Sequence, residues 1–334
     1  MGSLMDVTDL LAQAVAAGAS DLHLAAGEVP LLRLDGELRR MDMPVLMPAA
    51  LEQGVAGLLD DGQRRQWASG DELDLALAVP ALGRFRVNLF RQRNGPGASI
   101  RLIPARVPSL DELDLHDVFQ TIASNRDGLV LIGGPTGSGK SSTLAALVDQ
   151  LNREYALHIV TLEDPVEFIH QGQRSLVNQR EIGRDSRDFS QGLRSALRQD
   201  PDVIMVGELR DLESIRLALQ AAETGHLVLA TVHTRSAVNS IDRLVEVFAA
   251  EEKPLVRTML AESLRLVVAQ RLVRQVGGGR VAAREVLVVT PAVRNLIREG
   301  RMAQICSLMQ VGAAQGMVTM EEATRRLRQQ GLID

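Results

Sequence analysis

Apolar and polar residues alternate in short segments over the N-terminal third of the chain. The clearest case is residues 72–79, where Leu73, Leu75, Leu77 and Val79 take every second position, as one face of a β-strand does. Further extended segments are predicted at 21–25, 29–34, 83–91 and 99–103, and helices at 10–17 and 48–67. Strands joined by short turns, together with helices, predict a small α+β domain with an antiparallel sheet.

The pattern changes in the second part of the chain, where short unbroken apolar runs are separated by amphipathic helices. The runs lie at 129–132, 158–162, 203–206 and 227–232, and the helices at 140–153, 186–197 and 212–222. This order is typical of a parallel sheet that helices cover on both faces. From about residue 254 the chain is predicted to be mostly helical. The fold class is therefore α/β.

A segment with two prolines, PARVPSL at residues 104–110, separates the two patterns. Prolines without helical spacing mark a linker, and a chain of 334 residues is long enough for about two domains. We predict a first domain at 5–103, a linker at 104–112 and a second domain at 113–334.

Composition narrows the class of protein. The net charge of −5 gives no overall basic surface for nucleic acid, and 2% aromatic residues leave few stacking platforms for single strands. The single cysteine, Cys306, excludes an internal disulfide and a CxxC zinc site. Apolar runs are far shorter than the ~18 residues of a membrane span, and Asp6 and Asp9 do not fit a signal peptide. We expect a soluble cytosolic protein.

The segment GPTGSGKS begins at Gly134 and matches the phosphate-binding pattern G-x-x-x-x-G-K-[ST] in full. It follows a predicted strand and opens a predicted helix, which disfavours the alternative of a glycine-rich turn that binds nothing. Backbone N–H groups and the helix N-terminus would hold phosphate oxygens. Lys140 would reach the β- and γ-phosphates, and Ser141 would offer its hydroxyl to Mg²⁺. The candidate nucleotide-binding residues are Gly134, Pro135, Thr136, Gly137, Ser138, Gly139, Lys140, Ser141 and Ser142.

Polar residues follow the other three predicted parallel strands. Glu163 ends the strand at 158–162, Glu208 follows 203–206, and His233 follows 227–232. Ligands of open α/β sheets bind at these carboxyl ends. A single acid there is usually a helix cap or a solvated residue, but two beside a phosphate loop favour chemistry. Glu208 is assigned to the metal and Glu163 to the base that activates water; His233 is preferred to His226 because of its strand end.

Residues 81–110 contain six arginines and no acidic residue: Arg84, Arg86, Arg91, Arg93, Arg101 and Arg106. One interpretation is a solvated basic face. A second is that Arg86 and Arg101, on separate predicted strands, converge on a phosphate across a domain cleft. A nucleic-acid groove is the third, which the overall acidity disfavours.

Four segments follow one another as the Walker A, Asp box, Walker B and His box do in the secretion-superfamily ATPases, which the chain resembles. They are GPTGSGKSST (134–143), TLEDPVEF (161–168), RSALRQDPDVIMVGELRD (194–211) and AAETGHLVLATVHT (221–234). ASDLHL (19–24), LVNQRE (176–181), GGGRVAAREVL (277–287) and TPAVRNLIREG (290–300) are closer still to the PilT-type pilus retraction ATPases.

This resemblance implies a cytoplasmic homohexamer, peripheral at the inner membrane, with a PAS-like N-terminal domain and a RecA-like ATPase domain. It implies hydrolysis of ATP with Mg²⁺ to power pilus retraction and twitching motility, and partners that are an inner-membrane platform protein and related pilus ATPases; no DNA is expected. Glu163 corresponds to the catalytic glutamate, Glu208 to the Walker B acid and His233 to the His-box histidine. Arg86 and Arg101 match N-terminal-domain arginines that reach phosphate.

The resemblance leaves alternatives that hydrolysis measurements distinguish. The chain could be an accessory retraction paralogue that works only beside a partner motor, or a nucleic-acid translocase. Assembly and secretion relatives usually carry a longer N-terminus and a four-cysteine element, whose absence here favours retraction. The segment 292–299 resembles a signature linked to retraction, and the spacing of Val293, Leu296 and Ile297 predicts a short helix there. We hypothesise that its polar face couples the motor to its partners.

Overall fold

The computed structural model describes residues 6–103, 106–113, 115, 118–119 and 127–334. The chain divides into two compact units, Met1–Arg106 and Val107–Asp334, each of which is described by itself. Pro104 and Ala105 of the predicted linker lie outside the described residues.

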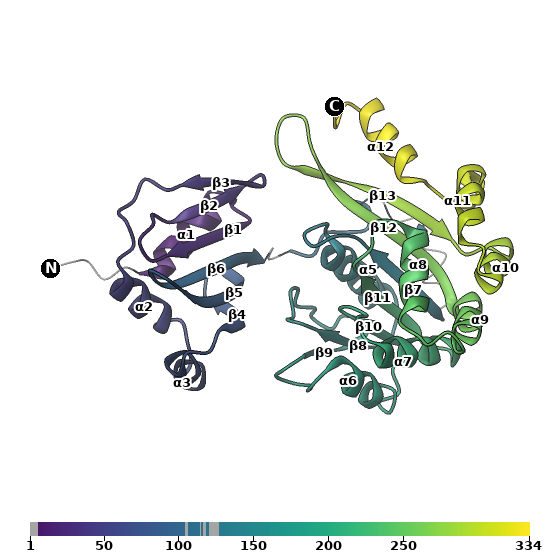
Figure 1. Cartoon of the computed structure of the whole chain (residues 1–334), viewed down its shortest axis with the longest axis horizontal. Coiled ribbons are helices and arrows are strands. Elements are labelled where there is room, and N and C mark those ends of the chain that lie inside the picture. Colours follow the sequence, from purple (N-terminus) through teal and green to yellow (C-terminus); the bar gives the residue numbers. More distant parts are fainter. Residues whose placement is uncertain (1–5, 104–105, 114, 116–117, 120–126) are drawn as a thin grey trace. The chain divides into compact units, whose positions relative to one another are not determined.

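The first unit is a six-stranded antiparallel sheet with three helices (Figure 1). Its sheet order is β3-β2-β1-β6-β5-β4. The strands are β1 (Asp21–Ala25), β2 (Leu31–Leu34), β3 (Glu37–Arg40), β4 (Leu73–Val79), β5 (Gly83–Gln92) and β6 (Gly95–Ile103), and the helices are α1 (Val7–Ala16), α2 (Pro48–Ala56) and α3 (Asp61–Ser69). Leu11, Leu22, Leu51, Phe85 and Ile100 are among its fully buried side chains. This agrees with the α+β domain that the alternation predicts.

The helix predicted over 48–67 is wrong in one respect, because the segment forms two helices. Gly57 caps the end of α2, and Asp60 begins α3 with a capping box in which its side chain and that of Gln63 each accept from the other residue's backbone N–H. Such a box fixes a helix start. The prediction also missed β3, whose residues Glu37–Arg40 are all exposed and so carry no apolar alternation.

The second unit contains a seven-stranded sheet of order β13-β12-β7-β11-β10-β8-β9 (Figure 1). The strands are β7 (Gly128–Gly133), β8 (His158–Glu163), β9 (Leu176–Glu181), β10 (Val203–Val206), β11 (Leu227–Val232), β12 (Leu264–Arg274) and β13 (Arg280–Val288). The helices are α5 (Lys140–Glu154), α6 (Phe189–Ala196), α7 (Leu212–Glu223), α8 (Ala237–Glu246), α9 (Lys253–Ser263), α10 (Pro291–Glu299), α11 (Met302–Val311) and α12 (Met320–Gln329), with a 3₁₀ turn at Ala313–Gln315.

Both faces of this sheet are buried, which explains the unbroken apolar runs. Leu129 and Leu131 of β7 pack in the core that residues of α6 to α11 build on one face. Val130 and Ile132 pack in the core on the other face, with Leu144 and Val148 of α5. Successive side chains of a strand point to opposite faces, so every position must be apolar when helices cover both. The predicted α/β fold with a parallel sheet is confirmed.

The region from residue 254 is less helical than predicted, because β12 and β13 interrupt the helices. β12 begins immediately after α9, at Leu264, without a turn residue between them, and it pairs in parallel with β7 and antiparallel with β13. A strand that follows a helix without a break carries no local boundary signal. The position of β12 beside β7 matters for the phosphate loop, because that loop follows β7. No helix in the described part of the chain is long and apolar enough to cross a membrane.

Candidate nucleotide site

The parallel registers bring the predicted site segments to one edge of the sheet. Val232 of β11 pairs with Gly133 of β7, and Val206 of β10 pairs with both Ala230 and Leu162. The residues that follow these strands therefore lie in a row: the loop after Gly133, then His233, the turn with Glu208, and Glu163. This is the edge at which parallel sheets bind ligands.

The loop between β7 and α5 depends on glycine. Gly134, Gly137 and Gly139 have φ angles of 156°, 76° and 88°, values that side chains rarely allow. A Cβ on Gly134 would also lie 2.6 Å from the carbonyl oxygen of Gln270. The tip, Pro135 to Gly137, is exposed, and Gly139 is the N-cap of α5.

Lys140 is the first residue of α5, and its side chain folds over the loop. Its Nζ donates to the carbonyl oxygens of Gly134 at 2.8 Å and Pro135 at 3.0 Å. Burial lowers the pKa of Lys140, and the nearby Glu167 opposes that shift. Ser141 and Ser142 follow in the first turn and are half-buried. The hydroxyl of Ser138 is buried and has no hydrogen-bond partner among the residues that the structure describes.

Glu163 ends β8 and is 8% exposed. Its Oε1 accepts from Thr161 Oγ1 at 2.7 Å and from Gln179 Nε2 at 3.0 Å. Burial raises the pKa of Glu163, and the two hydrogen bonds act against that shift. A carboxyl group with a raised pKa and a fixed orientation has the properties of a general base.

Glu208 and His233 form a pair between the ends of two neighbouring strands. His233 Nε2 lies 2.8 Å from Glu208 Oε2, a distance at which an N–H donates to a carboxylate. Arg210 forms an ion pair with the same carboxylate. Burial lowers the pKa of His233, and the positive charges of Lys140 and Arg210 lower it further. Burial and these two positive charges favour the neutral imidazole.

Gly207 lets the turn that carries Glu208 approach Glu163. Its N–H donates to Leu162 O at 2.7 Å, and a Cβ at this position would lie 3.2 Å from the same oxygen and 3.4 Å from the Cα of Glu163. The other histidine considered from the sequence, His226, lies at the opposite end of β11, where its Nδ1 is 3.0 Å from Ala221 O. His226 therefore does not belong to the row of candidate site residues at the carboxyl ends of the strands.

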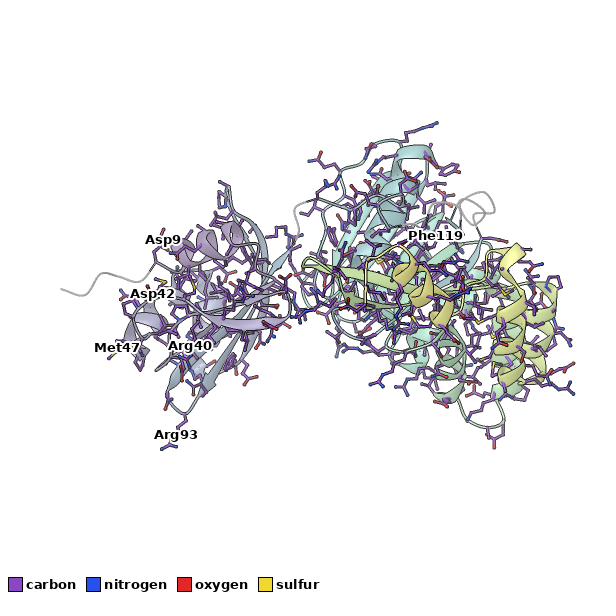
Figure 2. All side chains as sticks on the ribbon, turned by 90° about the horizontal axis from the view of Figure 1, so that it is seen from above. Asp9, Arg40, Asp42, Met47, Arg93 and Phe119 are labelled. Carbon is purple, nitrogen blue, oxygen red and sulfur yellow. The ribbon has the colours of Figure 1, made fainter. Side chains whose placement is uncertain are left out.

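Arg86 and Arg101 belong to the first unit, where they are paired across β5 and β6. Each has an acidic partner from an adjacent strand: Arg86 donates to Asp74 on β4, and Arg101 donates to Asp21 on β1 at 3.0 Å. Arg91 of the same predicted basic stretch contacts Glu52 and stacks on Trp67. Arg93 is exposed and projects from the turn between β5 and β6 (Figure 2). Acidic residues from other parts of the sequence thus pair with Arg86, Arg91 and Arg101 of the arginine-rich segment 81–110.

Two side chains that contact the candidate site, Gln179 and Gln270, were missed because their strands were not predicted. Gln179 on β9 donates to Glu163 and to Phe168 O at 2.8 Å. Gln270 on β12 is 2% exposed and contacts the phosphate loop. A glutamine inside the apolar run LRLVVAQ was the available signal, since a buried polar side chain needs a partner.

A glycine loop between a parallel strand and a helix, with two acids and a histidine along the same edge, defines a P-loop ATPase. The chain matches the family model "Type II/IV secretion system protein" over residues 4–332 and belongs to that family. Within the family it is an ATPase of the pilus retraction type.

Relatives align with nearly the whole chain. A Pseudomonas aeruginosa protein named type IV pilus retraction ATPase PilT is 52% identical over 329 residues, which are 98% of this chain and 96% of the relative. The type IV pilus ATPase PilU of the same organism is 39% identical over 98% of this chain and 86% of its own length. A crystal structure of the pilus retraction motor PilT with bound ADP has a TM-score of 0.88 at 41% identity, covering 99% of this chain and 95% of the other.

Proposed function

We propose that the chain is the Mg²⁺-dependent ATP-hydrolysing subunit of a homohexameric motor that retracts type IV pili. The observation that carries this proposal is the complete row of phosphate loop, Glu163, Glu208 and His233 in a chain 52% identical to a retraction ATPase. The motor would act in the cytoplasm at the inner membrane, on a platform protein of the pilus machine and beside related pilus ATPases. No DNA is involved.

The loop from Gly134 to Ser142 would hold the phosphates of ATP. The hydroxyl of Ser138, which is buried and has no partner in the described part of the chain, fits such an anion, because a buried donor without a partner is costly. On binding, Lys140 Nζ would exchange its bonds to the Gly134 and Pro135 carbonyls for the phosphate oxygens. The N-terminus of α5 adds partial positive charge.

Ser141 and Glu208 would hold Mg²⁺ beside the phosphates. Their hydroxyl and carboxylate oxygens are the ligands that this ion prefers, and the side chain of Glu208 is 13% exposed. Among the described residues, no group of three or more His, Cys, Asp or Glu could hold a metal. Mg²⁺ in nucleotide sites takes most of its ligands from phosphate and water. When bound, Mg²⁺ neutralises charge on the phosphates.

Glu163 would accept the proton of the attacking water. Thr161 and Gln179 donate to its Oε1, and the backbone N–H of Glu167 also donates to the carboxylate, so the group is held in a fixed orientation. The raised pKa brings its basicity closer to neutral pH, where proton transfer is most effective. His233 would sense the occupancy of the site through its bond to Glu208.

Arg86 and Arg101 would supply positive charge to the phosphates of a bound nucleotide. Their pairing across β5 and β6 places both guanidinium groups on the same face of the first unit's sheet, which supports a joint role. The acidic partners Asp74 and Asp21 would hold them in position until phosphate competes for them.

The test is retraction in cells that lack their own retraction ATPases. The wild-type chain alone should restore twitching motility, and Lys140→Ala should abolish it together with nucleotide binding. If the chain restores motility only when a second pilus ATPase is present, it is an accessory motor. If Lys140→Ala binds ATP as the wild type does, the phosphate loop is wrongly assigned.

A further inference from the structure

We propose that Gln270 of β12 is a positioning residue for the phosphate loop: its side-chain amide fixes the peptide group between Ser138 and Gly139, where the loop enters α5. The proposal rests on the nucleotide site proposed above and adds to it a residue from a strand outside the family's nucleotide-binding segments named in the sequence analysis.

The position of Gln270 follows from the strand pairing. β12 runs parallel to β7, with Ala269 paired to Gly133. Gln270 is therefore the next residue along the strand, level with the first residue of the loop. Its backbone carbonyl oxygen lies 2.6 Å from where a Cβ on Gly134 would be, and its Nε2 lies 3.2 Å from where a Cβ on Gly139 would be. One residue thus contacts both ends of the loop.

The amide makes two hydrogen bonds in a dry environment. Nε2 donates to Ser138 O at 2.8 Å, and Oε1 accepts from Thr143 Oγ1 at 3.0 Å. Gln270 and Thr143 are 2% and 1% exposed. A buried hydrogen bond is not weakened by competition with water, and the partner of a lost one stays unsatisfied. The pair of bonds fixes which way the amide faces, because the Ser138 carbonyl oxygen can only accept and must therefore face Nε2, while the Thr143 hydroxyl donates to Oε1.

The bond to Ser138 O determines the direction of the next N–H. The peptide between Ser138 and Gly139 is trans, and in a trans peptide the C=O and N–H point in opposite directions. With the carbonyl held toward Gln270, the Gly139 N–H points away from β12. Gly139 is the N-cap of α5, so this N–H belongs to the group of helix-start donors that bind phosphate. Without the amide, glycine at φ 88° leaves the peptide free to rotate.

Three variants separate orientation from packing. Gln270→Leu removes both hydrogen bonds. Gln270→Glu keeps the size of the side chain and can accept from Thr143, but an ionised carboxylate cannot donate to Ser138 O. Thr143→Val is isosteric and removes only the hydrogen bond to Gln270 Oε1. Ser263→Ala is the matched control. Ser263 is 1% exposed and donates to Met259 O at 2.7 Å. It directly precedes Leu264, the first residue of β12, at the end of the strand away from the phosphate loop.

The measurements are the Kd for a fluorescent ADP analogue and the kcat and KM for ATP hydrolysis of the full chain at pH 8. Gln270→Leu and Gln270→Glu should each raise Kd and KM about tenfold, the effect of about one buried hydrogen bond. Their kcat should stay within about threefold, because the loop holds the phosphates in the ground state and the transition state alike. Thr143→Val should raise KM about threefold, and Ser263→Ala should leave both constants unchanged.

Equal affinity in wild type and Gln270→Glu overturns the proposal, and so does a loss confined to kcat. If Gln270→Leu does not fold, Gln270→Glu and Thr143→Val still decide the question. A different result would contradict the proposed nucleotide site itself, namely that Lys140→Ala binds the ADP analogue as tightly as the wild type does. If Lys140→Ala loses binding while both Gln270 variants match wild type, only the role of Gln270 is wrong.

Discussion

Arg86 of β5 lies directly opposite Arg101 of β6, and an acidic side chain from the strand on either side holds each guanidinium group. Asp74, Arg86, Arg101 and Asp21 thus form a row of charges across four neighbouring strands. Like charges that face each other in a sheet are destabilising. The two acids offset that repulsion within the first unit, so the arrangement keeps two cations together.

We predict that Arg86→Ala and Arg101→Ala each lower ATP turnover by a factor of 10² or more, because a charge on the transferred phosphate is worth about several kcal/mol in the transition state. Phosphate release measures the turnover. Arg40→Ala is the control: Arg40, labelled in Figure 2, lies on the same unit and forms an exposed 3.0 Å ion pair with Glu28. Wild-type turnover in both variants would restore the interpretation of a solvated basic face.

Glu163→Gln should bind ATP with wild-type affinity but hydrolyse it about 10² to 10⁴ times more slowly, since an amide cannot take a proton from water. The amide oxygen still accepts the hydrogen bonds from Thr161 and Gln179. Single-turnover hydrolysis and binding of an ATP analogue measure the two effects. A variant that hydrolyses ATP at the wild-type rate would remove Glu163 from its assigned role.

The same substitution should stabilise the protein. Burial raises the pKa of Glu163 above its ordinary value of 4.5, so above pH 4.5 the unfolded chain loses this proton before the folded chain does. The folded state is then weakened as the pH rises, until the folded carboxyl also ionises. A glutamine does not ionise in this pH range, so the variant escapes this loss of stability. We expect the melting temperature of Glu163→Gln to exceed that of wild type by about 2–4 °C at pH 8.

The gain should vanish near pH 4, where the carboxyl is protonated in both states. Thermal melts of the two proteins from pH 4 to 8 test the sign. A difference that is constant over this range would mean that the ionisation of Glu163 does not affect stability.

Glu208→Gln should raise the Mg²⁺ concentration needed for half-maximal hydrolysis by about tenfold or more, because the metal loses a charged oxygen ligand. Saturating Mg²⁺ should recover part of the rate, whereas Glu163→Gln should not respond. Titration of Mg²⁺ against initial rate compares the two variants. If they behave the other way round, the roles of the two acids are exchanged.

Replacing Arg294 and Arg298 of α10 together should abolish pilus retraction while hydrolysis stays within about twofold of wild type, if this helix couples the motor to its partners. α10 packs through Val293 and Ile297, and Arg298 donates to Glu262 at 2.7 Å on the exposed surface. Twitching zones and phosphate release are compared in the same strains. Hydrolysis that falls in step with retraction would instead make α10 part of the catalytic scaffold.

The sequence by itself determined those parts of the site that depend on short segments and their order along the chain. The glycine loop could be recognised because its chemistry needs glycines, Lys140 and Ser141 at fixed spacing. Glu163, Glu208 and His233 could be grouped because parallel strands bring their carboxyl ends to one edge, so the order of strands and their end residues suffice.

Tertiary structure alone decided which distant residues complete these parts. Asp21 is 80 residues from Arg101, and Gln270 is 132 residues from Ser138. β12 starts directly after α9, and β9, which carries Gln179, is an edge strand of mixed composition, so neither has a periodic pattern that announces it. The partner of a buried polar group is set by which strands become neighbours, and that is a property of the packed sheet rather than of any segment.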